Sequence, residues 1–191
     1  MDDALSDSAV VDRLLEAIVL KDVERAGWLR VGIEAPESVA AHSWGVAFLV
    51  LALLPEDHDL ERALSYAVLH DLAEVRVGDI TPQDEVSRAD KIQREQRAMD
   101  QLLAGWSRGG RLKARWERYE AQQDSEARFV RQLDRLDMAL QAVAYAERDH
   151  LDLAEFLRSA ERVVTHPKLL PIMHELHRRH RSAHANKHRP D

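Results

Sequence analysis

Residues 69–79, LHDLAEVRVGD, place four side chains that can bind metals or transfer protons within ten positions. His70 and Asp71 are adjacent, Glu74 follows one helical turn later, and Asp79 closes the stretch. The four residues before His70, YAVL, are mostly apolar. Ionisable groups are costly to bury unless they are paired or bound to a metal. This stretch is therefore either a charged helix end in water or a functional site.

Two other segments supply side chains that would complete a metal site. His42 lies in a segment rich in Val, Ala and Leu, and Asp134 lies in VRQLDRLDMALQA. Two imidazoles and two carboxylates from three packed helices would bind a divalent ion in the core of a helical bundle. Asp137 competes with Asp134 for the last position. Taken singly, each residue is more often a packed or ion-paired side chain than a metal ligand, so the hypothesis depends on their joint occurrence.

The composition narrows the class of protein. With 191 residues and 45% apolar residues, the chain can form one domain with a substantial core. Few glycines, prolines and aromatic residues favour helices over a strand-rich fold. A net charge of −7 argues against a nucleic-acid polymer as partner. Because there is no cysteine, any metal must be bound by His, Asp and Glu.

The chain also lacks the sequence features of secreted and membrane proteins. The first residues are acidic, and charges interrupt the apolar residues that follow, unlike a secretory signal. The longest apolar run, VAFLVLALL at 46–54, is about half the length of a membrane span. We therefore expect a soluble cytoplasmic protein with no membrane partner.

The spacing of apolar residues predicts an all-α bundle with short connections and no strand. Residues 25–38 and 79–84 are predicted loops, and Ser38 is the expected N-cap of a buried helix. The predicted helices cover approximately residues 7–24, 39–54, 60–75, 87–105, 111–122, 125–148, 152–161 and 168–184.

We expect residues 1–170 to form one domain and residues 171–191 to form a His/Arg-rich C-terminal helix or tail. This tail holds five of the ten histidines, at spacings that place them on one helical face: His174, His177, His180, His184 and His188. We interpret it as a solvated terminal helix and assign it no function.

Longer motifs around these residues resemble a known family. The motifs are GWLRVGIEAPESVAAHSWGVAFL, YAVLHDLAEVRVGDITPQD, KIQREQRAMDQLL and ARFVRQLDRLDMALQA. Together with the order H…HD…D, they resemble the HD-domain metal-dependent phosphohydrolases. Within that superfamily they are most similar to the branch of HD domain-containing protein 2 and the bacterial 5′-deoxynucleotidases. The similarity covers about residues 10–170.

This resemblance implies an all-α HD fold with its metal site in the core, usually dimeric. It also implies hydrolysis of nucleoside 5′-monophosphates with a divalent ion, which could be Mn, Co, Mg, Fe, Zn or Ni. The implied metal ligands are His42, His70, Asp71 and Asp134. Asp134 is preferred to Asp137 because it matches the aspartate of the family motif.

The resemblance implies roles for three further residues. Glu74 and Asp79 match family residues that act beside the metal, as catalytic acid or base, as substrate contacts, or as ligands of a second metal. Arg25 matches an arginine that contacts phosphate. Ala26 stands where the bacterial 5′-deoxynucleotidases carry a tryptophan next to the sugar. Deoxyribonucleotides and ribonucleotides therefore both remain candidate substrates.

Other functions of similar proteins fit the sequence less well. An HD-fold oxygenase with two irons needs extra histidines between the HD pair and the last aspartate, and none occurs between His70 and His150. A cyclic-dinucleotide phosphodiesterase would carry a Gly-Tyr-Pro signature, which is absent. The remaining alternative to a metal-dependent phosphomonoesterase is a non-catalytic HD module that binds a nucleotide or a protein partner.

Overall fold

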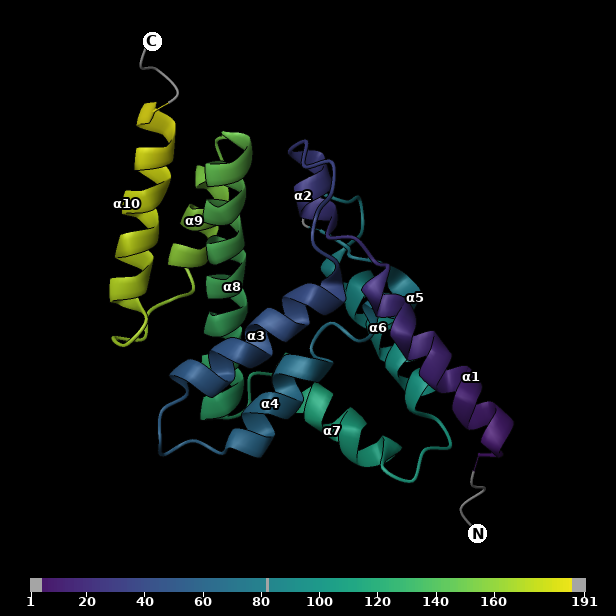
Figure 1. Cartoon of the computed structure of the whole chain (residues 1–191). Coiled ribbons are helices and arrows are strands. Elements are labelled where there is room, and N and C mark those ends of the chain that lie inside the picture. The colour runs from purple at the N-terminus through teal and green to yellow at the C-terminus, as the bar shows by residue number, and fades with distance from the viewer. Residues whose placement is uncertain (1–4, 82, 187–191) are drawn as a thin grey trace.

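The computed structural model describes residues 5–81 and 83–186, and these residues form helices and short connections (Figure 1). The described part contains no strand, only an isolated antiparallel bridge between Glu24 and Ser38. The all-α prediction is confirmed. The elements are α1 Asp7–Ile18, the 3-10 turn η1 Val19–Lys21, α2 Ala26–Arg30, α3 Val39–Leu53, α4 Leu60–Leu69, α5 Glu74–Val77, α6 Arg88–Leu103, α7 Gly109–Glu120, α8 Ser125–Asp149, α9 Ala154–Glu161 and α10 Leu170–Asn186.

The longest helix, α8, organises the main hydrophobic core. It begins where the Asp124 side chain accepts a hydrogen bond from the Ala127 N–H, a standard N-cap. Leu133, Leu136 and Ala139 are fully buried, and their spacing of three residues defines one face of the helix. Helices α3, α4, α9 and α10 pack around α8 (Figure 1). Side chains on α8 are thereby held at fixed positions relative to α3 and α4.

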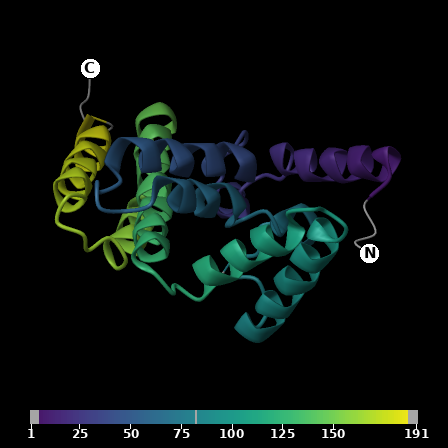
Figure 2. The ribbon, with the colours of Figure 1, turned by 90° about the horizontal axis from the view of Figure 1, so that it is seen from below.

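A second, smaller core lies between α5, α6 and α7. It is formed by Ala73, Ala98, Met99, Leu102 and Trp116. Seen from below, α6 and α7 lie side by side to one side of α3 and α4, and α7 packs against α4 (Figure 2). The HD dipeptide at residues 70–71 lies in the chain between α4, which belongs to the main core, and α5, which belongs to the smaller one.

The prediction of a single helix over residues 60–75 is wrong, because the α-helix ends at the HD dipeptide. Helix α4 ends at Leu69, and the Glu74 N–H donates to the Asp71 carbonyl rather than to that of His70. The His70 carbonyl instead accepts a hydrogen bond from Trp116 Nε1 in α7, at 3.3 Å. A tertiary hydrogen bond therefore replaces the next helical one, and the turn re-aims the side chains that follow.

The segment expected as a loop over residues 25–38 contains the short helix α2. The bridge between Glu24 and Ser38 fixes its start, and the Arg25 N–H donates to the Glu37 carbonyl at 3.1 Å. This pairing ties Arg25 to the residues that lead into α3. As expected, Ser38 caps α3, with its side chain accepting from the Ala41 N–H.

Helix α3 is apolar around its whole circumference, yet one side of it is exposed. Trp44, Phe48 and Leu51 follow one another at spacings of four and three residues and are 71%, 55% and 61% exposed. The expectation of a wholly buried helix is wrong for this face of the single chain. Helix α1 also exposes its apolar residues and projects from the rest of the molecule in Figure 2.

The C-terminal segment packs more closely than expected. Helix α10 contacts α8 and α9, with Met173, Leu176 and His180 buried and His174 exposed. The three described histidine side chains therefore do not share one solvated face. Of the other two, the His184 side chain and the whole of His188 lie outside the described part. Among the described residues, no helix has the length and apolar character that a membrane span requires.

Candidate metal centre

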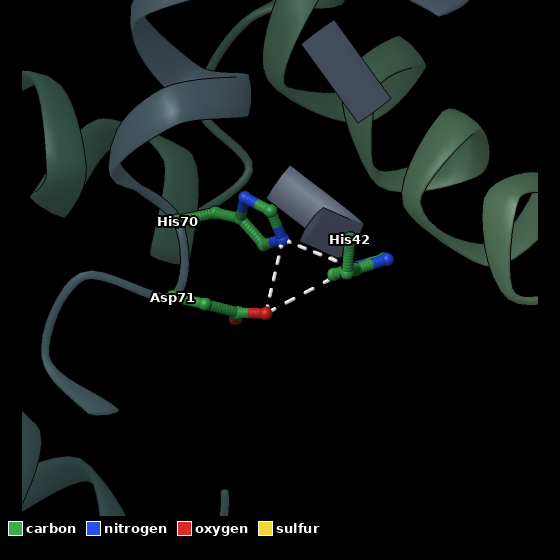
Figure 3. Close-up of side chains that lie close together, drawn as sticks. All are labelled: His42, His70 and Asp71. Atoms are coloured by element: carbon green, nitrogen blue, oxygen red, sulfur yellow. Dashed lines mark hydrogen bonds and ion pairs between the residues drawn. The ribbon is translucent and has the colours of Figure 1, made fainter. Parts of the chain in front are cut away.

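Four side chains from three segments converge between α3, α4 and α8. His42 comes from the first turn of α3, His70 and Asp71 from the turn after α4, and Asp134 from α8. His42 Nε2 lies 3.3 Å from His70 Nε2 and 3.2 Å from Asp134 Oδ1. Asp71 Oδ2 lies 3.2 Å from His70 Nε2 and 3.8 Å from His42 Nε2 (Figure 3). The structure thus brings together all four residues that were predicted to form a metal site.

The hydrogen bonds of the two imidazoles determine which ring nitrogens face the cluster. His70 Nδ1 lies 2.9 Å from the Ala67 carbonyl, which can only accept, so Nδ1 carries the proton. His42 Nδ1 lies 2.7 Å from Asp137 Oδ2, and an ionised carboxylate likewise only accepts. Both Nε2 lone pairs then face one another. Two lone pairs at 3.3 Å repel unless a proton or a metal cation lies between them.

This donor set fits a divalent cation. Imidazole nitrogens with a hydrogen-bonded Nδ1–H are typical metal ligands, and carboxylate oxygens complete sites for borderline or hard divalent ions. His42, His70 and Asp71 each offer one ligand atom within 4.8 Å of the others. Asp134 Oδ1 lies against the same His42 nitrogen from the α8 side. A cation among these atoms would relieve the repulsion between the facing nitrogens.

Without a cation, protonation of the imidazoles, whose Nε2 atoms each lie 3.2 Å from a carboxylate oxygen, supplies positive charge here. Burial and the charge of Arg25 oppose protonation of His42, but hydrogen bonds to Asp134 and Asp137 outweigh them and raise its pKa to about 9. Burial also opposes protonation of His70, but Asp71 raises the pKa of that imidazole above its usual value. Protons and a metal ion therefore compete for the same nitrogens.

The two carboxylates of the cluster remain ionised. Burial alone would raise the pKa of Asp71, but the adjacent charges of His70 and Arg25 hold it well below the usual range. Burial acts in the same direction on Asp134, and the charges of Arg135 and His42 hold its pKa below the usual range as well. Both acids are therefore available as anionic ligands at neutral pH.

Glu74 behaves in the opposite way. The residue is 4% exposed, and its Oε2 has no hydrogen-bond partner within the described part of the chain. Burial, followed by the negative charges of Asp71 and Asp79, raises the pKa of Glu74 to about 10. Its carboxyl group is therefore protonated at neutral pH in the metal-free protein. A neutral acid beside charged groups is the state required of a proton donor.

Arg25 and Asp79 form the side of the cluster nearest α2. Arg25 Nη1 lies 3.4 Å from Asp71 Oδ2. Burial opposes the charge on Arg25, but the surrounding carboxylates, with Asp71 first, raise its pKa further. Asp79 Oδ2 accepts a hydrogen bond of 2.8 Å from the Ala26 N–H at the start of α2. Asp79 thus helps to hold the segment that carries Arg25, a role that the sequence did not reveal.

Two other residues contribute to the site in ways that were not predicted from the sequence. Asp137 was considered only as a competing ligand, whereas its contact is with His42 Nδ1, on the ring edge away from the cluster. The i,i+3 spacing from Asp134, which places both acids on one helix face, was the signal available. Lys91 of α6 donates to the Ile80 carbonyl at 3.0 Å, and its positive charge acts on Glu74.

Comparison with known proteins places the chain in a family. A family model described as HD domain matches residues 18–173. The chain is 38% identical over 161 residues to 5′-deoxynucleotidase HDDC2 of Bos taurus, covering 82% of this chain and 78% of the relative. It is 35% identical over 156 residues to 5′-deoxynucleotidase hdd1 of Schizosaccharomyces pombe, covering 78% of each.

Solved structures show the same fold. A crystal structure of a protein from Pyrococcus horikoshii OT3 superposes with a TM-score of 0.75 at 32% identity, covering 88% of this chain and 99% of that one. A structure named as a predicted metal-dependent phosphohydrolase from Magnetospirillum magnetotacticum MS-1 gives a TM-score of 0.70 at 25% identity. It covers 92% of this chain and 93% of the other.

The raised pKa of Glu74 predicts how the stability of the metal-free protein depends on pH. The folded state holds this proton up to about pH 10, whereas an ordinary Glu loses it near 4.5. The stabilisation of the folded state by this proton on Glu74 is complete below pH 4.5 and is lost as the pH rises toward 10. Glu74→Gln removes this loss. The chelator-treated variant should match the parent near pH 4.5 and become the more stable protein above it, by roughly 1 kcal/mol per pH unit at most.

Urea unfolding followed by circular dichroism between pH 5 and 9 measures this difference. His42 titrates in the parent and the variant alike, so its contribution cancels in the comparison. A stability difference that is the same at every pH would contradict the assignment of a raised pKa to Glu74.

Proposed function

This chain belongs to the HD domain family, and on that premise we propose that it removes the 5′-phosphate from nucleoside monophosphates with a divalent cation. The observation that carries the proposal is the convergence of two imidazole nitrogens and two carboxylates beside an arginine whose side chain is 14% exposed. Relatives named 5′-deoxynucleotidases at 35–38% identity support the same reaction. A protonated Glu74 and a charged Arg25 beside the cluster favour an enzyme over a non-catalytic binding module.

We assign the cation to His42, His70, Asp71 and Asp134. Mixed nitrogen and oxygen ligands suit several divalent ions, so we expect Mn, Co, Mg, Fe, Zn or Ni to be accepted according to supply. When bound, such an ion would neutralise charge on the phosphate and lower the pKa of a water molecule. The two histidines, oriented through their Nδ1 atoms, keep their Nε2 atoms directed at it.

Arg25 is the group we assign to the substrate phosphate. Its guanidinium is charged at all relevant pH values and can form two parallel hydrogen bonds to phosphate oxygens. The backbone pairing of residues 24–25 with 37–38 and the Asp79–Ala26 hydrogen bond hold it beside Asp71. Phosphate bound there lies next to the atoms that bind the cation.

Glu74 is the residue we assign to proton transfer. Hydrolysis breaks the bond between phosphorus and the 5′-oxygen, and the leaving nucleoside oxygen must gain a proton. The neutral carboxyl group of Glu74 can donate it, and the carboxylate formed can then accept a proton from water. Since Asp79 uses Oδ2 for Ala26, we assign its Oδ1 to a sugar hydroxyl of the substrate. Glu74 and Asp79 are also our candidates for a second ion.

The sugar side of the proposed site begins at Ala26, which offers only a methyl group. A methyl group provides little surface against which a 2′-hydroxyl could be excluded. We therefore propose that ribonucleotides as well as deoxyribonucleotides are substrates.

We further propose that the protein is a cytoplasmic homodimer. Trp44 and Phe48 stack with ring centroids 5.8 Å apart on the exposed face of α3, and Leu51 extends this apolar stripe. Val68 of the neighbouring α4 is also 57% exposed. Contiguous apolar surface of this kind marks protein association sites, and in a two-fold dimer the same patch serves both subunits.

Phosphate release should require both the cation and Asp71. Protein stripped with chelator should release no phosphate from deoxyribo- and ribonucleoside 5′-monophosphates, and Mn²⁺, Co²⁺ or Mg²⁺ should restore release. Asp71→Ala should lose both the bound metal and the activity, because it removes an anionic ligand. Asp57→Ala, which changes an 85% exposed aspartate side chain, is the control and should retain both. A folded protein that binds metal but releases no phosphate would contradict the proposal.

Glu74→Gln should separate metal binding from turnover. The amide keeps the shape of the side chain but cannot donate a proton as an acid, so kcat should fall about 10²- to 10⁴-fold while metal affinity is largely kept. Glu117→Gln, the same chemical change at a 50% exposed side chain on α7, is the matched control. Measurement of kcat and of bound metal decides whether Glu74 acts as a proton donor or as a metal ligand. An unchanged kcat would exclude Glu74 as the acid.

Charges placed on the exposed face of α3 should separate the subunits. Trp44→Glu combined with Phe48→Glu should shift the mass in solution from twice the monomer mass to the monomer mass, because two charges per subunit cannot be buried in the interface. Size-exclusion chromatography with light scattering measures the mass. Ala114→Glu, on an exposed position of α7, should leave it unchanged. A parent protein that is already monomeric would contradict the dimer.

A further inference from the structure

We propose that Asp137 is a positioning residue for the metal centre, and that Gly45 is glycine because only glycine leaves room for it. Asp137 would hold the His42 ring so that Nε2, and not Nδ1, is directed at the cation. This inference rests on the proposed metal centre. It assigns a task to two residues that neither bind the cation nor contact the substrate.

The contact between Asp137 and His42 is short and protected from water. Asp137 Oδ2 lies 2.7 Å from His42 Nδ1, the imidazole is fully buried, and the carboxylate side chain is 14% exposed. An ionised carboxylate has no proton to give, so it selects the tautomer with hydrogen on Nδ1. Such partners of metal-binding histidines fix both the tautomer and the ring orientation.

Gly45 explains how Asp137 reaches the ring. It lies one turn after His42 in α3, on the side that faces α8. A Cβ atom at position 45 would overlap Asp137 Oδ1 and lie only 2.9 Å from Asp137 Cγ. Glycine is a poor residue for a helix interior and alanine is the best. Position 45 therefore carries the less favourable helix former at the point where alanine would collide with the carboxylate.

The two histidines of the centre differ in how their orientation is set. His70 Nδ1 is bound by the carbonyl of Ala67, one turn earlier in the same chain segment, and no side-chain substitution removes that acceptor. His42 depends on a side chain from α8, which is 95 residues away in sequence. The orientation of His42 is therefore set by the packing of α3 on α8, through Asp137 and Gly45.

A different interpretation of the same residues is a separate ion site. Glu37, His42 and Asp137 also offer ligand atoms within 4.8 Å of one another. However, Glu37 Oε1 already accepts from Trp28 Nε1 at 2.9 Å, and Asp137 already accepts from His42. Both acids have donors without an ion, which favours the positioning role. The number of ions bound per chain tests the difference.

The experiment measures zinc affinity by competition with a chelator, in the absence of substrate, for the parent, Asp137→Asn and Gly45→Ala. We expect both variants to bind zinc about 10- to 100-fold more weakly, with the same number of ions per chain. The asparagine amide can donate to Nδ1 and so permits the opposite tautomer. The added methyl group in Gly45→Ala displaces the carboxylate. Since both changes act on one bond, the double variant should be little weaker than either single variant.

Nitrogen-15 NMR of the histidine rings in the zinc-loaded protein provides the second readout. In the parent, His42 should show a protonated Nδ1 and a zinc-bound Nε2, and this pattern should be lost or mixed in Asp137→Asn. Glu37→Gln is the matched control. It removes a negative charge from a neighbouring half-buried acid, but it leaves the His42–Asp137 bond in place, so zinc affinity and the ring pattern should stay close to those of the parent. A purely structural role would lower the melting temperature without changing the ring pattern.

Each other outcome overturns a defined part of the inference. If the parent binds zinc and both variants bind it equally well, the positioning role is wrong. If Asp137→Asn loses one of two bound ions, Asp137 is a ligand of a second site. If the parent binds no divalent ion, the proposed metal centre itself is wrong. Failure to release phosphate from nucleotides would leave the zinc comparison unaffected, so the two proposals fail separately.

Discussion

The repulsion between two imidazole nitrogens that face one another 3.3 Å apart is the constraint on which the rest of the site depends. Each ring is held by a hydrogen bond on its far side, which His42 donates to Asp137 and His70 donates to the Ala67 carbonyl. The lone pairs so exposed are tolerated only with positive charge between them. In the metal-free protein, Asp134 and Asp137 raise the pKa of His42 and Asp71 raises that of His70, so protonated imidazoles supply this charge. In the proposed enzyme, a divalent cation would supply this charge, and the ionised Asp71 and Asp134 would be its anionic ligands.

The helical bundle positions the groups around these two nitrogens through contacts between segments that are distant in the sequence. Helix α8 brings Asp134 and Asp137 to opposite ring nitrogens of His42, one on each side of the same imidazole. Trp116 donates a hydrogen bond to the His70 carbonyl at the end of α4. The turn that follows carries Asp71 and the buried Glu74. The same arrangement creates two opposite carboxyl environments. Asp71 is held ionised by the adjacent His70 and Arg25, whereas burial, together with the charges of Asp71 and Asp79, holds Glu74 neutral.

Helix α3 has separate tasks on its two faces. Its inner face carries His42 and the glycine that admits Asp137, and its outer face carries the exposed Trp44, Phe48 and Leu51. A helix that is apolar on all sides is expected to be covered on all sides. In the single chain only one side of α3 is covered. Association through the outer face would therefore brace the helix that holds His42 and would couple the rigidity of the site to assembly.

The sequence by itself determined the helical class, the order H…HD…D and the set of residues that the fold brings together. These features depend on local periodicity and residue type, which neighbouring positions record directly. Tertiary structure alone decided that α4 ends at Leu69, because the hydrogen bond responsible comes from Trp116, 46 residues away. It also decided which nitrogen of His42 each aspartate of α8 contacts, and that one face of an apolar helix stays exposed. Such outcomes depend on which distant groups meet, and no local pattern encodes that choice.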